Sequence, residues 1–383
     1  MNILVFGASF PNPAEPLLGI FNFKLLEKYP SEHDIKVVAP VPLGLNFRRG
    51  HQGRIAWEDT VEIGLRMVEV YRPRYLLLPR RLLMPLIGFI EFLCCLATVA
   101  RIHKSWQIDL IHVNFAYPDG IAAMWLSRML KISYVLTEHR GLLAETLDNI
   151  WVKSQLTQVY RSAAAVTTVS EYNARVLFKK TGVKAIHIPN GLDFERFEQG
   201  YMREKLYELV CVSHLIPAKG IQYLIESISI LKQQGTQYKL DIIGEGSHRS
   251  HLEKLIIELG LQQEVSLKGA YPPKKLEQEL PNYDALVLPS LRESFGIVLI
   301  EAMAAGLPVI ATRCGGPEQI VNDDTGILVA PGSAEALVQG IRELSSRWSS
   351  YDSSLIRFTA ESKYSLDSVV KLYFQVYNDA TRK

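Results

Sequence analysis

Two glutamates, Glu293 and Glu301, lie eight residues apart in the segment LPSLRESFGIVLIEAMAAGLP, which reads as a strand, a loop and a helix. Glu301 falls within the helix, predicted over about Phe295–Ala305, and its neighbours in the sequence are apolar all round. A carboxylate in such surroundings needs hydrogen-bond donors, and the two adjacent hydroxyl groups of a ribose are suitable ones. The pattern indicates a buried, ribose-binding carboxylate, with an internal arginine or backbone amides as the alternative partners.

The start of this predicted helix has the features of a phosphate site. The first backbone N–H groups of a helix have no partner within it, and the helix dipole adds positive potential there. Both features favour a phosphate group. Five residues around this turn are therefore candidate binding residues: Glu293, Ser294, Phe295, Gly296 and Ile297. For Glu293 the alternative is an ordinary acidic residue at a helix start.

Polar residues also follow other apolar runs that read as strands. Lys219 lies in VSHLIPAKG with His214, and its ammonium group can neutralise a diphosphate. Glu245 follows KLDIIG, where it can approach a ribose or a base, and His139 follows ISYVLTE. Gly19, after the first run, lets the backbone approach a diphosphate closely. The alternatives are a solvated lysine, a core histidine and a simple turn glycine.

Short apolar runs alternate with amphipathic stretches along the whole chain, and this rhythm predicts the elements that position these residues. Five runs precede the loop IPNGLDFERF, and five more follow it, from YELVCVSHL to GLPVIAT. Strands that alternate with helices form parallel sheets, and ligands bind beyond the carboxyl ends of such strands. We therefore predict an α/β protein of two Rossmann-like, doubly wound domains, residues 1–188 and 189–360.

The composition is typical of a folded protein of about two domains. The chain has 383 residues, of which 48% are hydrophobic and 21% charged. Its 4 cysteines form neither a disulfide framework nor a zinc-binding spacing, which is typical of a reducing compartment. The N-terminal run MNILVFGASF reads as a strand and a turn rather than an export signal. These features predict a cytoplasmic protein.

The two halves of the chain carry opposite charges. Up to Pro189 there are 22 Lys+Arg and 15 Asp+Glu, a balance of +7, and beyond it there are 20 and 25, a balance of −5. A basic half suggests an anionic partner, and both nucleic acid and a membrane leaflet qualify. An ordinary solvated surface is the alternative.

A long apolar segment with a basic start lies in the first half, RPRYLLLPRRLLMPLIGFIEFLCCLATVARIHK. Leu82–Ala100 is nearly long enough to span a bilayer, but Pro85 and Glu91 argue against a spanning helix. The segment instead predicts a helix that packs partly on its domain and rests a basic, apolar edge on an anionic leaflet. A buried helix with solvated arginines is the alternative. The arginines concerned are Arg72, Arg74, Arg80 and Arg81, with Arg101 at the end of the apolar stretch.

Several of these segments together resemble one enzyme family. The pair Glu293 and Glu301 is similar to the E-x7-E signature of family 4 of the retaining glycosyltransferases. IPNGLDFERF resembles that family's interdomain segment, and HLIPAKGIQYLIES resembles its phosphate-binding stretch. GIFN at Gly19, TEH at Thr137 and GILVAPGSAEAL at Gly326 also match. The resemblance covers nearly the whole chain and implies the GT-B fold, in which two Rossmann-like domains face each other across a cleft.

The resemblance also implies roles for the candidate residues. Glu301 would bind the ribose of the donor, Glu293 the transferred sugar and Lys219 the diphosphate, while His139 would lie at the reaction centre. The chain departs from the family pattern at His214, where an arginine is frequent, and after His139, where an acid is frequent. By the same analogy, a C-terminal helix within residues 361–383 would pack back on the N-terminal domain.

The implied reaction moves a hexose or N-acetylhexosamine, with retained anomeric configuration, from a nucleotide sugar, with UDP as the expected nucleotide. The acceptor would be a growing glycan or a polyprenyl-diphosphate-linked one, in the synthesis of a surface polysaccharide such as a teichuronic-type polymer. A nucleotide-sugar epimerase of the same fold and a two-domain sugar-binding protein are the alternatives. No Asp-x-Asp or His-x3-His pattern occurs, so we expect no metal and no other cofactor. No element interleaves basic and aromatic residues, so we expect no nucleic-acid partner.

Overall fold

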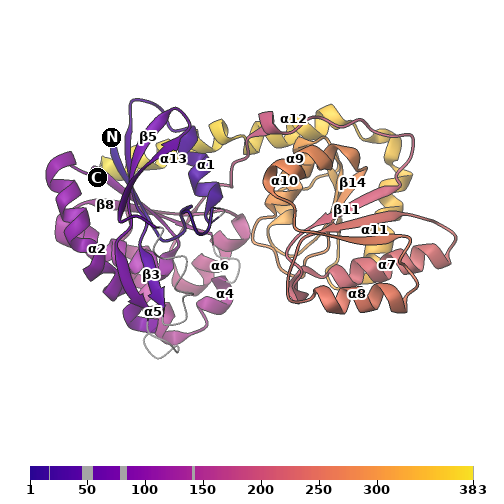
Figure 1. Cartoon of the computed structure of the whole chain (residues 1–383), viewed down its shortest axis with the longest axis horizontal. Coiled ribbons are helices and arrows are strands. Elements are labelled where there is room, and N and C mark those ends of the chain that lie inside the picture. Colours follow the sequence, from indigo (N-terminus) through magenta and orange to yellow (C-terminus); the bar gives the residue numbers. More distant parts are fainter. Residues whose placement is uncertain (17, 45–54, 78–83, 140–142, 383) are drawn as a thin grey trace. The chain divides into compact units, whose positions relative to one another are not determined.

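The computed structural model describes all residues except 17, 45–54, 78–83, 140–142 and 383. The chain forms two compact units (Figure 1). Unit 1 contains Met1–Gly191 and Leu366–Lys383, and unit 2 contains Leu192–Ser365. Each unit is built on a mainly parallel sheet with helices packed on it. The predicted class, an α/β protein of two Rossmann-like domains, is confirmed.

The main sheet of unit 1 has eight strands in the order β10-β9-β8-β7-β1-β2-β5-β4. All neighbours run parallel except β4 and β5. The central strands are buried because helices cover both faces, which explains their continuous apolar sequences. The strands of unit 1 are β1 (Asn2–Phe6), β2 (Asp34–Val38), β4 (Glu58–Ile63), β5 (Arg66–Tyr71), β7 (Leu110–Asn114), β8 (Ser133–Glu138), β9 (Ala165–Thr168) and β10 (Ile186–His187), with β3 (Val41–Gly44) and β6 (Arg74–Leu77) paired separately.

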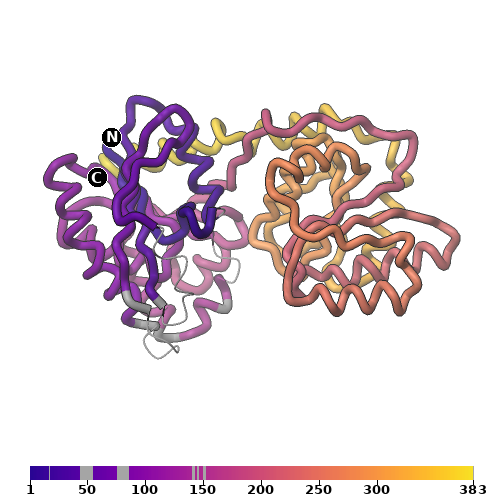
Figure 2. The backbone as a smooth tube through the Cα atoms, in the orientation of Figure 1, coloured from indigo at the N-terminus to yellow at the C-terminus, as the bar shows by residue number. Residues whose placement is uncertain are grey.

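Two apolar cores lie against this sheet. One core includes side chains of α2, α3 and α5, and the other includes side chains of α1 and α13. The helix α13 comes from the far end of the sequence, and Figure 2 shows the two chain ends close together in unit 1. The helices of unit 1 are α1 (Ile20–Glu27), α2 (Met84–Trp106), α3 (Ile121–Leu130), α4 (Leu143–Thr146), α5 (Ile150–Ser162), α6 (Glu171–Thr181) and α13 (Leu366–Thr381).

The helix α6 shows how local sequence sets the bounds of an element. The Ser170 side chain accepts a hydrogen bond from the backbone N–H of Asn173, which satisfies a free donor of the first turn. Gly182 ends the helix in the left-handed conformation, with φ 73°. These two signals are visible in the sequence, and the structure places the helix between them.

The sheet of unit 2 has six parallel strands in the order β13-β12-β11-β14-β15-β16. The order reverses between β11 and β14, so the connections leave these two strands in opposite directions, a point at which such sheets bind ligands. The strands are β11 (Glu208–Val212), β12 (Lys239–Ile243), β13 (Val265–Gly269), β14 (Ala285–Leu288), β15 (Val309–Thr312) and β16 (Gly326–Val329), and the helices are α7 (Ile221–Gln233), α8 (Arg249–Glu258), α9 (Pro273–Glu279), α10 (Ile297–Ala304), α11 (Ala334–Ser346) and α12 (Ser353–Tyr364).

The apolar segment of the first half forms α2. By length and composition Leu86–Trp106 is long and apolar enough to cross a membrane, with a mean hydropathy of 1.7. One face of α2 nevertheless belongs to the core of unit 1, where Phe92, Cys95 and Val99 are buried. Glu91 is also fully buried on this helix. The helix is therefore a core helix of unit 1 that leaves its other face exposed.

Two sequence predictions need correction here. Arg72, expected on a membrane-facing edge, is only 2% exposed, and its guanidinium group lies 3.7 Å from the carboxylate of Asp59. Arg74 is exposed and donates to the carbonyl of Ile55, whereas Arg80 and Arg81 lie outside the described residues. We also predicted a C-terminal helix within residues 361–383. In the structure, the C-terminal helix of unit 1 begins at Leu366, and residues 361–364 belong to α12 of unit 2.

Candidate functional site

Three predicted site residues of unit 2 follow neighbouring strands of its sheet. Lys219 follows β11, Glu245 follows β12 and Glu293 follows β14. The carboxyl ends of parallel strands lie at one edge of a sheet, and β11 and β14 flank the point where the strand order reverses, with β12 beside β11. The structure therefore gathers these residues at the ligand-binding edge of unit 2.

Lys219 and Glu293 form an ion pair, with 2.6 Å between Lys219 Nζ and Glu293 Oε2. Their side chains are 20% and 14% exposed, so solvent reaches the pair but screens it only partly. The two loops are joined by a hydrogen bond from the N–H of Leu291 to the carbonyl of Ala218. The pair thus presents one cation and one carboxylate side by side, at a fixed place and open to a ligand.

A glycine brings these loops together. Gly220 begins α7 with φ 63°, in the left-handed region that glycine adopts without cost. A Cβ atom at this position would lie 2.2 Å from the carbonyl oxygen of Pro289. Only glycine allows the loop after β11 to approach the loop after β14 this closely, and Lys219 is the residue directly before it.

The predicted phosphate-binding turn is built differently from the expectation. Phe295 is buried and Gly296 has φ 95°, so the regular helix α10 begins two residues later than predicted, at Ile297. Ser294 is half-buried between Glu293 and Phe295. The N–H of Gly316 donates to the carbonyl of Glu293 at 2.7 Å, which anchors the loop.

Glu301 lies one turn after Ile297, on the same face of α10. We predicted a buried carboxylate, and Glu301 is half-buried, because this face of the helix is more open than the face formed by Leu299, Ile300 and Ala302. Close packing around the carboxyl group, helped by Glu277 and opposed by Arg196, raises the pKa of Glu301 to about 7. Hydroxyl groups that donate hydrogen bonds to such a carboxyl group stabilise its ionised form.

Glu245 and His214 are exposed, as is Ile297 at the start of α10. The N–H of Leu215 donates to the carbonyl of Glu245, so the two loops that carry Glu245 and His214 run side by side. The carboxylate of Glu245 accepts a hydrogen bond from Arg249 at 2.9 Å. Arg249 was not predicted as a site residue, although its place four residues after Glu245 at the start of a helix was a visible signal.

In unit 1, His139 follows β8 and lies between two aromatic rings. The ring centroids of Phe21 and Phe115 lie 4.7 and 5.3 Å from that of its imidazole. His139 Nε2 is 3.0 Å from Oδ1 of Asn114, the last residue of β7. Burial and the nearby His112 lower the pKa of His139 to about 3, partly opposed by Asn190. The imidazole is therefore neutral at pH 7 and offers hydrogen bonds rather than charge.

The backbone beside His139 is strained. Phe115 has φ 69°, a conformation that is unfavourable for an aromatic residue with a Cβ atom. Such strain persists where the surrounding structure holds it, frequently at functional sites. Neither Asn114 nor Phe115 was predicted as a site residue, because one lies at a strand end and the other in a loop without any motif of its own.

Gly19 serves the turn after β1, and its approach to a diphosphate stays a prediction. It begins α1 with φ 63°, and a Cβ atom there would lie 2.2 Å from the carbonyl oxygen of Ser9. Asn22 donates from its side chain to the same carbonyl. Gly19 therefore folds the loop after β1 onto itself and sets the start of α1, which carries Phe21 to His139.

Asp119 is a further residue at this edge of unit 1. Its carboxylate accepts a hydrogen bond from the N–H of Ala8, in the loop after β1, at 3.2 Å. Glu91 approaches it from α2, and burial together with this negative neighbour raises the pKa of Glu91 well above its usual range. Within the part of the chain that the structure describes, no group of three His, Cys, Asp or Glu side chains is arranged to hold a metal ion.

Each half of the chain matches a known protein family. The family described as Glycosyltransferase Family 4 matches residues 20–196, and the family described as Glycosyl transferases group 1 matches residues 193–357. An uncharacterized glycosyltransferase of Methanocaldococcus jannaschii is 30% identical over 252 residues, covering 64% of this chain and 67% of that protein. TuaC of Bacillus subtilis, provisionally named a teichuronic acid biosynthesis glycosyltransferase, is 28% identical over 361 residues, covering 89% and 88%.

The solved structures that resemble this chain have the same architecture. Anabaena HepE in complex with UDP superimposes with a TM-score of 0.72, at 19% identity, over 99% of this chain and 100% of that one. Its similarity concerns the fold, which is GT-B. Together with the two family matches and the archaeal relative, the comparison shows that this chain belongs to the group 1 and family 4 glycosyltransferases.

Proposed function

We propose that this glycosyltransferase moves a hexose or N-acetylhexosamine from a nucleotide sugar to a glycan or lipid-linked acceptor, with retention of the anomeric configuration. The observation that carries the proposal is the pair of Lys219 and Glu293 at the switch point of unit 2, with Glu301 one helical turn beyond the start of α10. These are the residues that the family resemblance assigns to the diphosphate, the sugar and the ribose.

The chemistry explains why a cation belongs at this place. When the bond between the anomeric carbon and the diphosphate breaks, the diphosphate gains charge and the sugar becomes cation-like, so stabilising the leaving group dominates catalysis. Lys219 would turn from Glu293 toward the diphosphate, and Glu293 would then be free to accept hydrogen bonds from sugar hydroxyl groups. At an effective dielectric constant near 20, a charge pair at about 4 Å contributes about 4 kcal/mol.

Two names among the similar proteins support the finer parts of the proposal. HepE was solved with UDP, which supports UDP as the nucleotide. The provisional name of TuaC supports synthesis of a surface polysaccharide, and the acceptor would then be a growing or polyprenyl-diphosphate-linked glycan. We further propose that transfer requires no metal or other cofactor, since Lys219 supplies a positive charge for the diphosphate. The enzyme would work in the cytoplasm, at the inner face of the membrane, without a nucleic-acid partner.

The test is a screen of the purified protein against a panel of nucleotide sugars, with and without acceptor lipids and EDTA. We expect one donor to release its nucleotide, with transfer detected by mass spectrometry and the anomeric configuration read by NMR. Lys219→Ala should lower turnover roughly 100-fold to 1000-fold, the usual cost of one preorganised donor, and Glu301→Ala should weaken donor binding. The matched controls are Lys254→Ala and Glu258→Ala, exposed positions on α8.

Each other outcome has a definite meaning. Interconversion of the sugar without transfer would identify an epimerase, and binding without release would identify a sugar-binding protein. Equal losses in the α8 controls would remove Lys219 and Glu301 from the site. Activity that is abolished by EDTA and restored by a divalent cation would contradict metal independence.

A further inference from the structure

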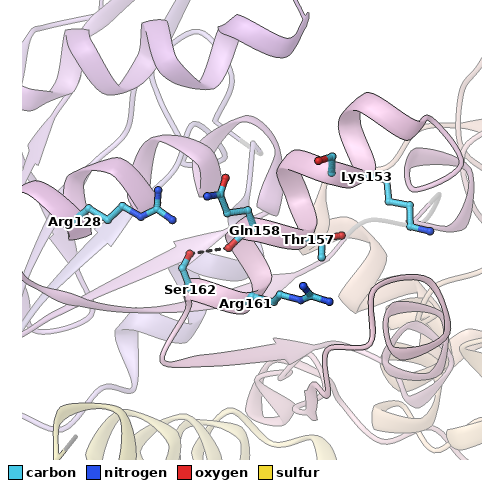
Figure 3. A pocket seen from close by; sticks show the side chains of 7 residues that line it. Arg128, Lys153, Thr157, Gln158, Arg161 and Ser162 are labelled. Atoms are coloured by element: carbon cyan, nitrogen blue, oxygen red, sulfur yellow. Dashed lines mark hydrogen bonds between the residues drawn. The ribbon is translucent and has the colours of Figure 1, made fainter.

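A basic pocket lies on unit 1, between α3 and α5 (Figure 3). It has a volume of about 540 Å³. Figure 3 shows Arg128 entering from α3, with its guanidinium group directed toward Gln158 and Ser162 of α5. The lining residues are Arg128, Lys153, Ser154, Thr157, Gln158, Arg161 and Ser162.

The chemistry of this pocket fits an anion. Arg128, Lys153 and Arg161 supply three cations, and Ser154, Thr157 and Gln158 supply hydroxyl and amide donors, whereas the hydroxyl of Ser162 already donates to the carbonyl of Gln158. None of the lining residues is a carboxylate, and none of the three cations forms an ion pair with a carboxylate among the residues that the structure describes. Their charge is therefore available to a ligand, and arginine is the side chain best suited to phosphate oxygens.

An exposed apolar row continues directly from the pocket. The guanidinium carbon of Arg128 lies 5.4 Å from the ring centroid of Trp125 on α3, and that ring lies 5.9 Å from the ring of Phe89 on α2. Leu86, Phe89 and Leu93 follow one another at helical spacing and are 49%, 39% and 53% exposed. Met129, next to Arg128, is 57% exposed.

Large apolar side chains seldom gather on an exposed surface without a partner. Here they adjoin the basic pocket through the contact of Trp125 with Arg128, and this combination is typical of a surface that lies on an anionic bilayer, with apolar side chains in the acyl boundary and basic ones at the headgroups. An anionic bilayer complements both the basic pocket and the apolar row. An uncharged apolar partner would cover the apolar row and leave the basic pocket unfilled.

We propose that unit 1 docks on an anionic phospholipid bilayer through this surface, with a headgroup phosphate in the pocket of Arg128, Lys153 and Arg161 and with Leu86, Phe89 and Leu93 in the interface. This inference rests on the proposed function in that a lipid-linked acceptor is reached at a membrane. It assigns the contact to α2, α3 and α5, and not to the arginines before α2 that the sequence suggested.

The experiment measures binding of the full chain to vesicles by co-sedimentation. The vesicles are phosphatidylcholine alone or phosphatidylcholine with phosphatidylglycerol. The pocket variant is Arg128→Gln/Lys153→Gln/Arg161→Gln, and its matched control is Lys179→Gln/Lys184→Gln/Lys371→Gln, three exposed lysines of unit 1 outside the pocket. A second variant, Leu86→Ser/Leu93→Ser, removes apolar side chains that are exposed on α2 and so leaves the core intact.

We expect the wild type to bind phosphatidylglycerol vesicles and not phosphatidylcholine ones. Each basic residue at an anionic surface strengthens binding about fivefold, so the pocket variant should bind about 100-fold more weakly and the lysine control within about threefold of the wild type. The leucine variant should lose roughly tenfold. Wild-type binding that is absent, equal losses in pocket and control variants, or full binding by the pocket or leucine variant would each overturn the proposal.

The outcome is separable from that of the proposed function. Nucleotide-sugar binding is measured on the same variants in solution, without lipid, by calorimetry. We expect it to be unchanged, because none of the substituted residues is a candidate donor-binding residue. Donor binding without vesicle binding would overturn the bilayer contact alone, and vesicle binding without donor binding would count against the transferase.

Discussion

At the scale of single residues, each polar group of the candidate site depends on neighbours that hold it in place. Gly220 lets the loop of Lys219 approach Pro289, and Asn114 bonds the imidazole of His139. Lys219 and Glu293 follow apolar runs, and the topology of a parallel sheet brings such positions together. Asn114 and Phe115 could not be found in this way, since their importance comes from contact with His139, which depends on tertiary packing. Arg72 was misplaced for a similar reason, because a local pattern does not tell whether a charged residue at a strand end is buried.

The carboxyl group of Glu301 predicts a pH dependence of donor binding. Its pKa is about 7, so the ionised fraction rises about tenfold between pH 6 and pH 8. Hydroxyl groups of a ribose stabilise the ionised form, and donor affinity should rise by a similar factor over this range. Calorimetry with an intact nucleotide sugar measures this donor affinity at each pH. In Glu301→Gln the affinity should be lower and nearly independent of pH, and an unchanged pH profile in that variant would remove Glu301 from this role.

Glu91 predicts a pH dependence of stability. Burial and Asp119 raise its pKa in the folded state above its value in the unfolded state. The associated stability is therefore fully present below the unfolded pKa and is lost as pH rises toward the folded pKa, by up to about 1.4 kcal/mol per pH unit. Glu91→Gln should gain stability relative to the wild type from pH 5 to pH 7 in urea unfolding. The exposed Glu62→Gln is the control, and parallel curves for all three proteins would contradict the prediction.

At the scale of elements, the strands and most helices follow from apolar periodicity, whereas the closeness of two loops does not. The apolar runs predicted β11, β12 and β14, and their polar ends predicted a site. The start of α10 was predicted at Phe295, ahead of Gly296. In the structure, Phe295 packs its ring into unit 2 and the helix begins only after Gly296.

The two glycines that flank α7 provide a matched test of loop approach. Gly220 precedes the helix and Gly235 follows it, with φ 63° and 80°. A Cβ atom at Gly220 would meet the carbonyl of Pro289 at 2.2 Å, whereas at Gly235 it would meet nothing within 4 Å. Gly235→Ala should cost about 1 kcal/mol. Gly220→Ala should cost clearly more and should weaken donor binding, as calorimetry and urea unfolding will show. Equal effects would mean that the loop near Lys219 adapts freely.

At the scale of the whole molecule, the two-domain organisation was readable because the βα rhythm restarts after IPNGLDFERF. The return of the chain to unit 1 was implied by resemblance alone. Its physical basis is α13, whose buried residues Tyr373 and Tyr377 join the same core as Ile3 and Val37. Periodicity shows that such a helix is amphipathic, but it does not show which of two cores receives it.

Tyr377 tests this connection. It is fully buried, and its hydroxyl lies 2.6 Å from that of Tyr29 and 2.8 Å from Nδ1 of His112. Tyr377→Ala should destabilise unit 1 by about 3–5 kcal/mol, while nucleotide-sugar binding by unit 2 stays intact. Calorimetric unfolding with and without a nucleotide sugar measures the stability of unit 1 and donor binding by unit 2 separately. Tyr377→Phe keeps the ring and should cost about 1–3 kcal/mol, and a loss of donor binding in step with unit 1 would show that the units do not unfold separately.

The same helix has a consequence for how the protein is made. Residues 192–365 are contiguous, so unit 2 has all of its chain as soon as Ser365 has left the ribosome. Unit 1 begins to emerge first but lacks α13 until Leu366–Thr381 follow. The apolar face that receives this helix stays uncovered while some 170 further residues are synthesised, which takes about 10–35 s at bacterial to eukaryotic rates. The half of the molecule that is translated first is therefore the last to be completed, and during that interval it is the part most open to chaperones and to aggregation.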